Sequence, residues 1–166
     1  MNVTLRPART ADVVAIRGLI DMHTADRRML AKAAVTLYED VQEFIVAEVD
    51  GEVAGCGALH VMWRDLAEVR TLVVQDELQG RGIGSQILRL LLDRARGLGV
   101  QRVFCLTFEV EFFSGHGFEE IKGSPVEPDV YEHLLESYDE GVAEFLGLER
   151  VRPNYLGNHR MLMVLE

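Results

Sequence analysis

The chain has 166 residues, 48% of them hydrophobic and 27% charged, which is the composition of an ordinary globular domain with one core. A net charge of −10 argues against nucleic acid and anionic membranes as partners, and no apolar run is long enough to span a membrane. The N-terminus lacks the pattern of a signal peptide, so we expect a cytoplasmic protein. Cys56 and Cys105 lie in apolar runs without a CxxC spacing and are predicted to be reduced core thiols. The five histidines are scattered, which gives a metal site little support.

In the first half of the chain, the sequence predicts one strand, then two helices, then three strands. Thr10 is placed to cap the first helix, whose apolar positions recur with helical spacing. Asp50-Gly51 is a two-residue turn of the kind that closes a β-hairpin. In chain order the predicted elements are strand 3–6, a helix that begins after Thr10, a second helix at about 33–40, strand 43–49, strand 52–61 and strand 68–74.

The second half of the chain alternates helices and strands. A long amphipathic helix begins near Ile83, and Gly97 and Gly99 are expected to end it. The elements that follow are strand 101–107, a short helix around Phe112 and Phe113 that leads into another strand, a helix over 129–145, and a closing strand at 160–165. This order predicts a single α/β domain over 1–166 with a mixed sheet, and an extra helical segment at about 125–147 before the last strand.

Three glycines lie between the strand at 68–74 and the long helix. Gly80, Gly82 and Gly84 leave the backbone uncovered at a helix N-terminus, where the N–H groups and the helix dipole favour a bound phosphate. The alternative is a flexible turn before an ordinary helix. The glycines are not followed by Gly-Lys-Ser/Thr and are not spaced as GxGxxG, which argues against a nucleoside triphosphate loop and a dinucleotide fold.

The hexapeptide from Gln79 to Gly84 resembles the pyrophosphate loop, Q/R-x-x-G-x-G/A, of the GNAT superfamily of N-acetyltransferases. The resemblance extends from Arg6 to Phe118. It implies a mostly antiparallel mixed sheet flanked by helices, acetyl-CoA as co-substrate and no metal. The cofactor-binding residues implied are Leu72, Val73, Val74, Gln79, Gly80, Arg81, Gly82, Ile83, Gly84 and Ser85. Among these, backbone at 72–74 would pair with pantetheine, and the N–H groups near Leu72 and Val73 would stabilise the oxyanion if the strand bulges there.

Glu68 is the candidate catalytic base. It precedes Gln79 by eleven residues, which is the spacing of the catalytic glutamate in histone acetyltransferases of this superfamily. An amine is protonated at neutral pH and must lose a proton before it attacks a thioester. The alternative for Glu68 is a solvated charge at the start of a strand. Phe113 stands where many members have a tyrosine that protonates the leaving thiolate, so the general acid stays unassigned.

A closer resemblance involves the acetyltransferase domain of bacterial N-acetylglutamate synthases, and the short actinobacterial form in particular. It is carried by Phe44–Leu59, by Gln101–Phe118 and by the tail from Asn154 to Leu162. The resemblance implies acetylation of the α-amino group of L-glutamate, the first step of arginine biosynthesis. Basic and polar side chains that would hold the two carboxylates of glutamate are Lys32, Arg70, Thr71, Thr107, Asn158 and Arg160.

Two other functions stay open at this stage. One is acetylation of another small amine or a protein N-terminus, since an acidic chain suits a cationic acceptor. The other is a sensor that binds acyl-CoA without turnover, which the presence of Glu68 disfavours. The sequence leaves monomer and homodimer open, and it assigns no effector.

Overall fold

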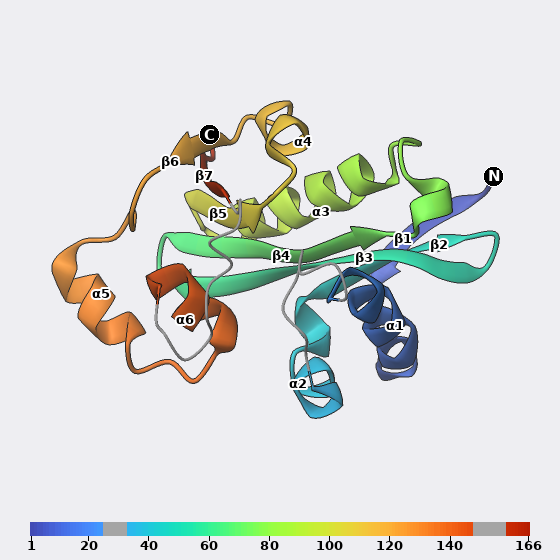
Figure 1. Ribbon diagram of the computed structural model, residues 1–166, viewed down its shortest axis with the longest axis horizontal. Coiled ribbons are helices and arrows are strands. Elements are labelled where there is room, and N and C mark those ends of the chain that lie inside the picture. The colour runs from blue at the N-terminus through green and yellow to red at the C-terminus, as the bar shows by residue number, and fades with distance from the viewer. Residues whose placement is uncertain (25–32, 148–158) are drawn as a thin grey trace. The chain divides into compact units, whose positions relative to one another are not determined.

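The computed structural model describes residues 1–24, 33–147 and 159–166 of the chain (Figure 1). The strands are β1 (Val3–Pro7), β2 (Phe44–Val49), β3 (Glu52–Trp63), β4 (Leu66–Val74), β5 (Arg102–Thr107), β6 (Glu119–Ile121) and β7 (His159–Val164). The helices are α1 (Val13–Thr24), α2 (Ala34–Glu39), α3 (Ile83–Leu98), α4 (Val110–Ser114), α5 (Pro128–Leu134) and α6 (Glu140–Leu146).

The strands form a sheet in the order β1-β2-β3-β4-β5-β7-β6. The β1–β2, β2–β3, β5–β7 and β6–β7 pairs are antiparallel, while β4 and β5 are parallel. The predicted fold class, a mixed and mostly antiparallel sheet flanked by helices, is therefore confirmed. The chain divides into two compact units, Met1–His60 with Val69–Gly99 and Val61–Glu68 with Val100–Glu166, and β3 and β4 contribute residues to both.

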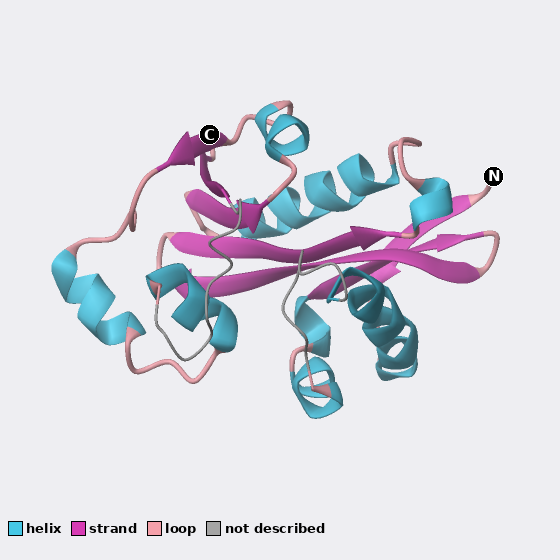
Figure 2. Cartoon of the chain, in the orientation of Figure 1, coloured by secondary structure: helices cyan, strands magenta, loops and turns pink. Residues whose placement is uncertain are grey.

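In the first unit, helices cover both faces of the strands, with α1 and α2 on one side and α3 on the other (Figure 2). The α1 side is filled by buried residues of α1, α2 and the strands β2, β3 and β4. They are Val13, Ile16, Leu19, Ile20, Leu37, Phe44, Val46, Cys56, Ala58 and Val73. On the α3 side, Gly57 of β3 lets the helix approach closely, because a Cβ at this position would lie 2.8 Å from Cγ2 of Ile87. Gly99, in the left-handed conformation, ends α3, whereas Gly97 lies inside the helix and does not end it.

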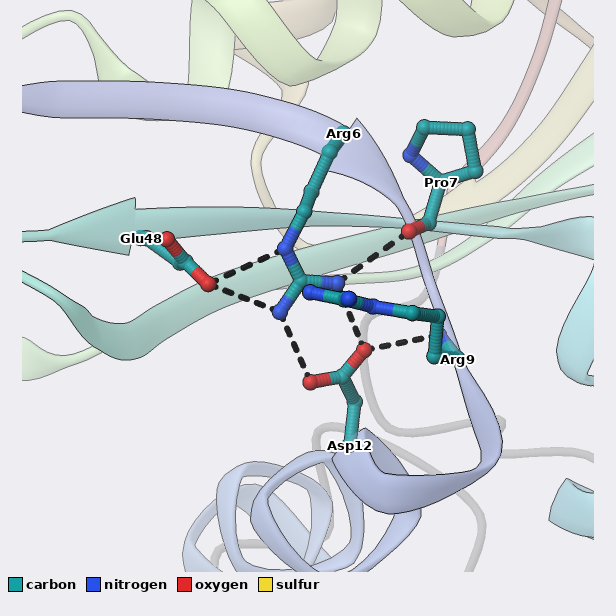
Figure 3. A network of polar contacts seen from close by, with 5 residues as sticks. All are labelled: Arg6, Pro7, Arg9, Asp12 and Glu48. Atoms are coloured by element: carbon teal, nitrogen blue, oxygen red, sulfur yellow. Dashed lines mark hydrogen bonds and ion pairs between the residues drawn. The ribbon is translucent and has the colours of Figure 1, made fainter.

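An ion-pair network fixes the start of α1 to the strands (Figure 3). The guanidinium of Arg6 contacts the carboxylates of Asp12 at 2.7 Å and Glu48 at 2.8 Å. Asp12 also accepts the backbone N–H of Arg9 at 2.7 Å. The prediction that Thr10 caps this helix is wrong, because Thr10 begins a short 3-10 turn and the carboxylate of Asp12 bonds the free amide instead. Arg6 lowers the pKa of Asp12, and Asp12 in turn raises the pKa of Arg6.

In the second unit, α5 and α6 cover an apolar surface formed by β4, β5 and the end of β3. The buried residues there are Met62, Leu66, Phe104, Leu134, Val142, Phe145 and Leu146. The rings of Phe104 and Phe145 meet edge to face, with their centroids 4.8 Å apart. The single helix predicted over 129–145 is wrong, because the segment folds as two short helices. Asp139 caps the second one by accepting the N–H of Val142 at 2.8 Å, and Tyr138 before it is 96% exposed.

Candidate active site

The loop between β4 and α3 presents bare backbone in the first unit. Gly80 and Gly82 have φ values of 77° and 84°, in the left-handed region that glycine adopts without strain. A Cβ built on either glycine would have no atom within 4 Å, so the space in front of this backbone is open. The side chain of Gln79 folds back and donates to the carbonyl oxygen of Val74 at 3.2 Å and to the carboxylate of Asp76 at 3.0 Å. These two hydrogen bonds stabilise the loop, and Gly80 and Gly82 are exposed.

The N-terminus of α3 supplies N–H groups to the same loop. Gly82 is the N-cap, and its carbonyl oxygen accepts the N–H of Gln86 at 3.1 Å. The N–H groups of Ile83, Gly84 and Ser85 precede that bond and have no acceptor within the helix. The first turn carries no acidic side chain, and Arg81 beside it is exposed. A helix of sixteen residues with this opening has the geometry of an anion site.

Strand β4 is kinked at Thr71, three residues after Glu68. Thr71 has φ of 58°, which is a strained conformation for a β-branched residue and interrupts the regular pleat. The carbonyl oxygen of Thr71 accepts a hydrogen bond from the thiol of Cys56, 3.5 Å away. The backbone of Leu72 and Val73 follows directly, so the strand carries the irregularity on which the oxyanion prediction depends.

Glu68 is buried, with 3% of its surface exposed, and it lies opposite Phe104 in the parallel β4–β5 ladder of the second unit. The alternative of a solvated charge at a strand start is therefore wrong. The carboxylate acts on two neighbours: it adds to the effect of burial that raises the pKa of Cys105, and it partly opposes the burial that lowers the pKa of Arg160. A buried carboxylate beside a half-buried cation is an arrangement found at functional sites.

Arg160 on β7 is held by backbone and by aromatic rings. Its guanidinium donates to the carbonyl oxygen of Gly123 at 2.9 Å and to that of Phe145 in the last turn of α6. The guanidinium carbon lies 5.5 Å and 5.8 Å from the ring centroids of Phe104 and Phe145. A guanidinium has five N–H groups, so these two bonds leave donors that can meet a carboxylate.

The remaining predicted acceptor residues have different surroundings. Thr107 ends β5, and its hydroxyl accepts the N–H of Glu109 at 2.8 Å, so it shapes the turn after the strand. Arg70 is half-buried in β4 and has a polar partner. Lys32 and Asn158 lie outside the described residues. The loop, Arg70 and Thr71 belong to the first unit, whereas Glu68, Thr107 and Arg160 belong to the second.

Both cysteines of the chain are buried free thiols, as predicted. Burial raises the pKa of Cys56 to about 12, so this thiol stays protonated at neutral pH. Across residues 1–24, 33–147 and 159–166 there is no cluster of side chains that could hold a metal ion. No helix within the same ranges is long and apolar enough to cross a membrane. The contact of Cys56 with β4 could not be predicted from the sequence, because its apolar neighbours give no sign of a polar partner.

A central strand that leads through a glycine loop into a helix N-terminus defines an α/β protein with a site for a phosphate-bearing cofactor. Residues 17–118 match the acetyltransferase (GNAT) family. The chain belongs to this family, whose enzymes use acetyl-CoA as co-substrate. The resemblance inferred from the loop is thereby confirmed.

Individual relatives agree with this assignment. The chain is 56% identical over 164 residues to an amino-acid acetyltransferase of Mycobacterium tuberculosis, a match that covers 97% of this chain and 94% of the relative. The crystal structure of Rv2747 from the same organism, in complex with CoA and NLQ, superposes with a TM-score of 0.94 at 55% identity and covers 98% and 99% of the two chains. An N-acetylglutamate synthase from Neisseria gonorrhoeae, complexed with coenzyme A and N-acetyl-glutamate, gives a TM-score of 0.78 at 26% identity. This chain spans 36% of the synthase's length.

Proposed function

We propose that the chain transfers the acetyl group of acetyl-CoA to the α-amino group of L-glutamate, by direct attack within a ternary complex. The whole of 1–166 acts as one cytoplasmic acetyltransferase domain, and its product enters arginine biosynthesis. The observation that carries this proposal is the buried carboxylate of Glu68 on the central strand of a GNAT fold. The relative named as an amino-acid acetyltransferase and the synthase bound to N-acetyl-glutamate support an amino-acid acceptor.

The cofactor is held by backbone. In this proposal the N–H groups from Gly80 to Ser85 bind the pyrophosphate, with the dipole of α3 adding positive potential and Arg81 adding a charge. Gln79 shapes the loop, because its N–H donates to the carbonyl oxygen of Asp76 at 3.3 Å. The backbone of Leu72, Val73 and Val74 pairs with the amides of pantetheine. This arrangement suits a chain with a net charge of −10, because N–H groups attract the phosphates at short range whatever the overall charge.

The chemical step begins with a proton. Glu68 takes it from the ammonium of the acceptor, directly or through one water, and the freed nitrogen lone pair attacks the thioester carbonyl carbon. The carbonyl oxygen becomes an oxyanion that the N–H groups of Leu72 and Val73 stabilise. When the tetrahedral intermediate collapses, its nitrogen loses a second proton to water, the carbon–sulfur bond breaks, and CoA leaves as a thiolate that takes up a proton from the solvent. No side chain is assigned to protonate it, since Phe113 has no proton to give.

The acceptor carries two carboxylates, which need basic or amide partners if they are to leave water. Arg160 is a half-buried cation attracted to Glu68, and it is the described residue best placed to meet one of them. Lys32, Arg70 and Asn158 are the further candidates, with Thr71 and Thr107 as neutral donors. A cationic amine is the competing acceptor, and the acidic charge of the chain favours it.

A thiol-release assay with purified protein tests the assignment. Acetyl-CoA is offered with glutamate, glutamine, alanine, lysine and a polyamine, and free CoA is measured for each, with Glu68→Gln as the control for turnover by a contaminant. A preference for glutamate over glutamine is expected, because the amide of glutamine leaves a basic group unpaired. If lysine or the polyamine reacts faster, the competing acceptor takes over, and acetyl-CoA binding without any turnover would establish the sensor.

A further inference from the structure

A buried thiol contacts the kinked backbone of β4 in the first unit. Cys56 is 0% exposed and packs in the core under α1 and α2, and its sulfur donates to the carbonyl oxygen of Thr71 at 3.5 Å. A side chain in a strand stands roughly perpendicular to the sheet, whereas a regular carbonyl points along the sheet to the next strand. The carbonyl that this thiol meets belongs to Thr71, whose left-handed conformation departs from that of a regular strand.

The orientation of this carbonyl fixes the next N–H group. A peptide unit is planar and trans, so the carbonyl of Thr71 and the N–H of Leu72 lie in one plane and point in opposite directions. A hydrogen bond that holds the carbonyl therefore also holds the N–H. The same bond polarises the peptide, which makes the N–H a stronger donor.

The residues on either side of Cys56 make room for the kink. A Cβ on Gly55 would lie 3.2 Å from the carbonyl oxygen of Val73, and a Cβ on Gly57 would lie 3.1 Å from Cδ1 of Leu72. The sequence Gly55-Cys56-Gly57 thus presents one donor side chain between two positions at which any side chain would press on β4 or its neighbours. The alternative is that Cys56 only fills space in the core, as buried cysteines often do. That alternative does not account for its hydrogen bond to the carbonyl oxygen of Thr71, a residue in the left-handed conformation.

We propose that Cys56 is a positioning residue for acetyl transfer: its thiol holds the Thr71–Leu72 peptide so that the Leu72 N–H is aimed at the developing oxyanion. This rests on the proposed function, in which that N–H stabilises the intermediate. The thiol stays a donor over the working range, because burial keeps its pKa far above neutral. Cys56 itself touches neither acetyl-CoA nor the acceptor.

The test compares variants that keep or remove the donor. Cys56→Ser keeps an O–H, Cys56→Ala removes it, and Cys56→Val removes it while filling the space. Loss of one weak hydrogen bond to the peptide should lower kcat about fivefold in Cys56→Ala and Cys56→Val, with an unchanged KM for acetyl-CoA, and Cys56→Ser should stay within about twofold of wild type. Val46→Ala is the matched control, because Val46 lies opposite Cys56 on β2 and belongs to the same core cluster.

NMR of the Thr71 carbonyl carbon provides a second measurement, which does not depend on turnover. The NMR resonance of the Thr71 carbonyl carbon responds to a hydrogen bond at its oxygen, so it should move in Cys56→Ala and Cys56→Val and much less in Cys56→Ser. Wild-type kcat in Cys56→Val, an equal loss in Cys56→Ser, or the same loss in Val46→Ala would overturn the proposal. If the wild-type protein acetylates no amine, the proposed function fails and the role of Cys56 in it fails too. Turnover with a donor-independent kcat overturns the role of Cys56 alone.

Discussion

Replacement of Gly82 by aspartate should abolish most of the affinity for acetyl-CoA. Gly82 has φ of 84° and open space where a Cβ would go, so a new side chain meets no protein atom but projects from the N-terminus of α3. The left-handed conformation costs a non-glycine residue about 1–2 kcal/mol, which lowers the stability of the fold. The aspartate carboxylate adds about 1–3 kcal/mol of repulsion for a phosphate charge about 5 Å away. Together with lost access to the N–H groups, the expected loss of affinity is about tenfold to a hundredfold.

The opposite end of the same helix provides the controls. Gly99 has φ of 85° and equally open space, so Gly99→Ala and Gly99→Asp impose the same backbone strain and the same charge away from the loop. Titration calorimetry with acetyl-CoA should show wild-type affinity for both, while Gly82→Ala loses only a little and Gly82→Asp loses most. Thermal unfolding should show a similar decrease for the two alanine variants. An unchanged affinity in Gly82→Asp, or an equal loss in Gly99→Asp, would refute the loop as the pyrophosphate site.

Three further predictions concern charged side chains. Glu68→Gln should lower kcat with little change in acetyl-CoA affinity, and a pH series from about 6 to 9 should show the deficit shrinking as free amine becomes plentiful; a wild-type profile would remove Glu68 from the mechanism. Lys32→Met and Arg160→Met should each raise the KM for glutamate by a factor that corresponds to about 1.5–3 kcal/mol for each charged hydrogen bond lost. The KM for acetyl-CoA should stay nearly unchanged. Arg160→Met should also lower Tm, and an unaltered glutamate KM in both variants would contradict the assignment. Asp12, whose pKa is lowered by Arg6, should stabilise the fold above the unfolded pKa of about 4 and less as pH falls below it. Urea unfolding of Asp12→Asn between pH 2 and 7 should therefore show a weaker loss at acid pH than wild type.

Local patterns in the sequence predicted most strands and helices. The predictions that failed are those in which contacts made only in the folded chain decide the local structure. The hairpin at Asp50-Gly51 follows from two residues that both accept positive φ, and it is present. The start of α1 depends instead on Arg6, which draws the carboxylate of Asp12 toward the strands. Arg6 is itself held by Glu48, which lies 42 residues further along the chain. Helical spacing over 129–145 does not show the break, since apolar residues of α5 and α6 keep a compatible period across it.

The candidate site shows the same division. The glycine loop can be recognised in the sequence, because glycine is the residue that leaves the backbone uncovered and adopts positive φ without strain. The conformation of Thr71 is not, because threonine is a strand former that avoids positive φ. Only the structure shows the kink and the thiol of Cys56 that meets it.

Burial of Glu68 is the feature that the core itself does not require. Its neighbours Leu66 and Phe104 belong to an apolar cluster with α5 and α6, in which a leucine would be the simpler occupant of the same position. Buried carboxylates cost several kcal/mol to desolvate, and a nearby cation such as Arg160 at best offsets that cost, so replacing a buried ion pair by apolar residues is often neutral or stabilising. A buried charged residue that does not stabilise the fold is therefore a candidate for a functional role. In a GNAT chain whose adjoining backbone has a left-handed residue at Thr71, the role that we propose for Glu68 is to accept a proton from the attacking amine.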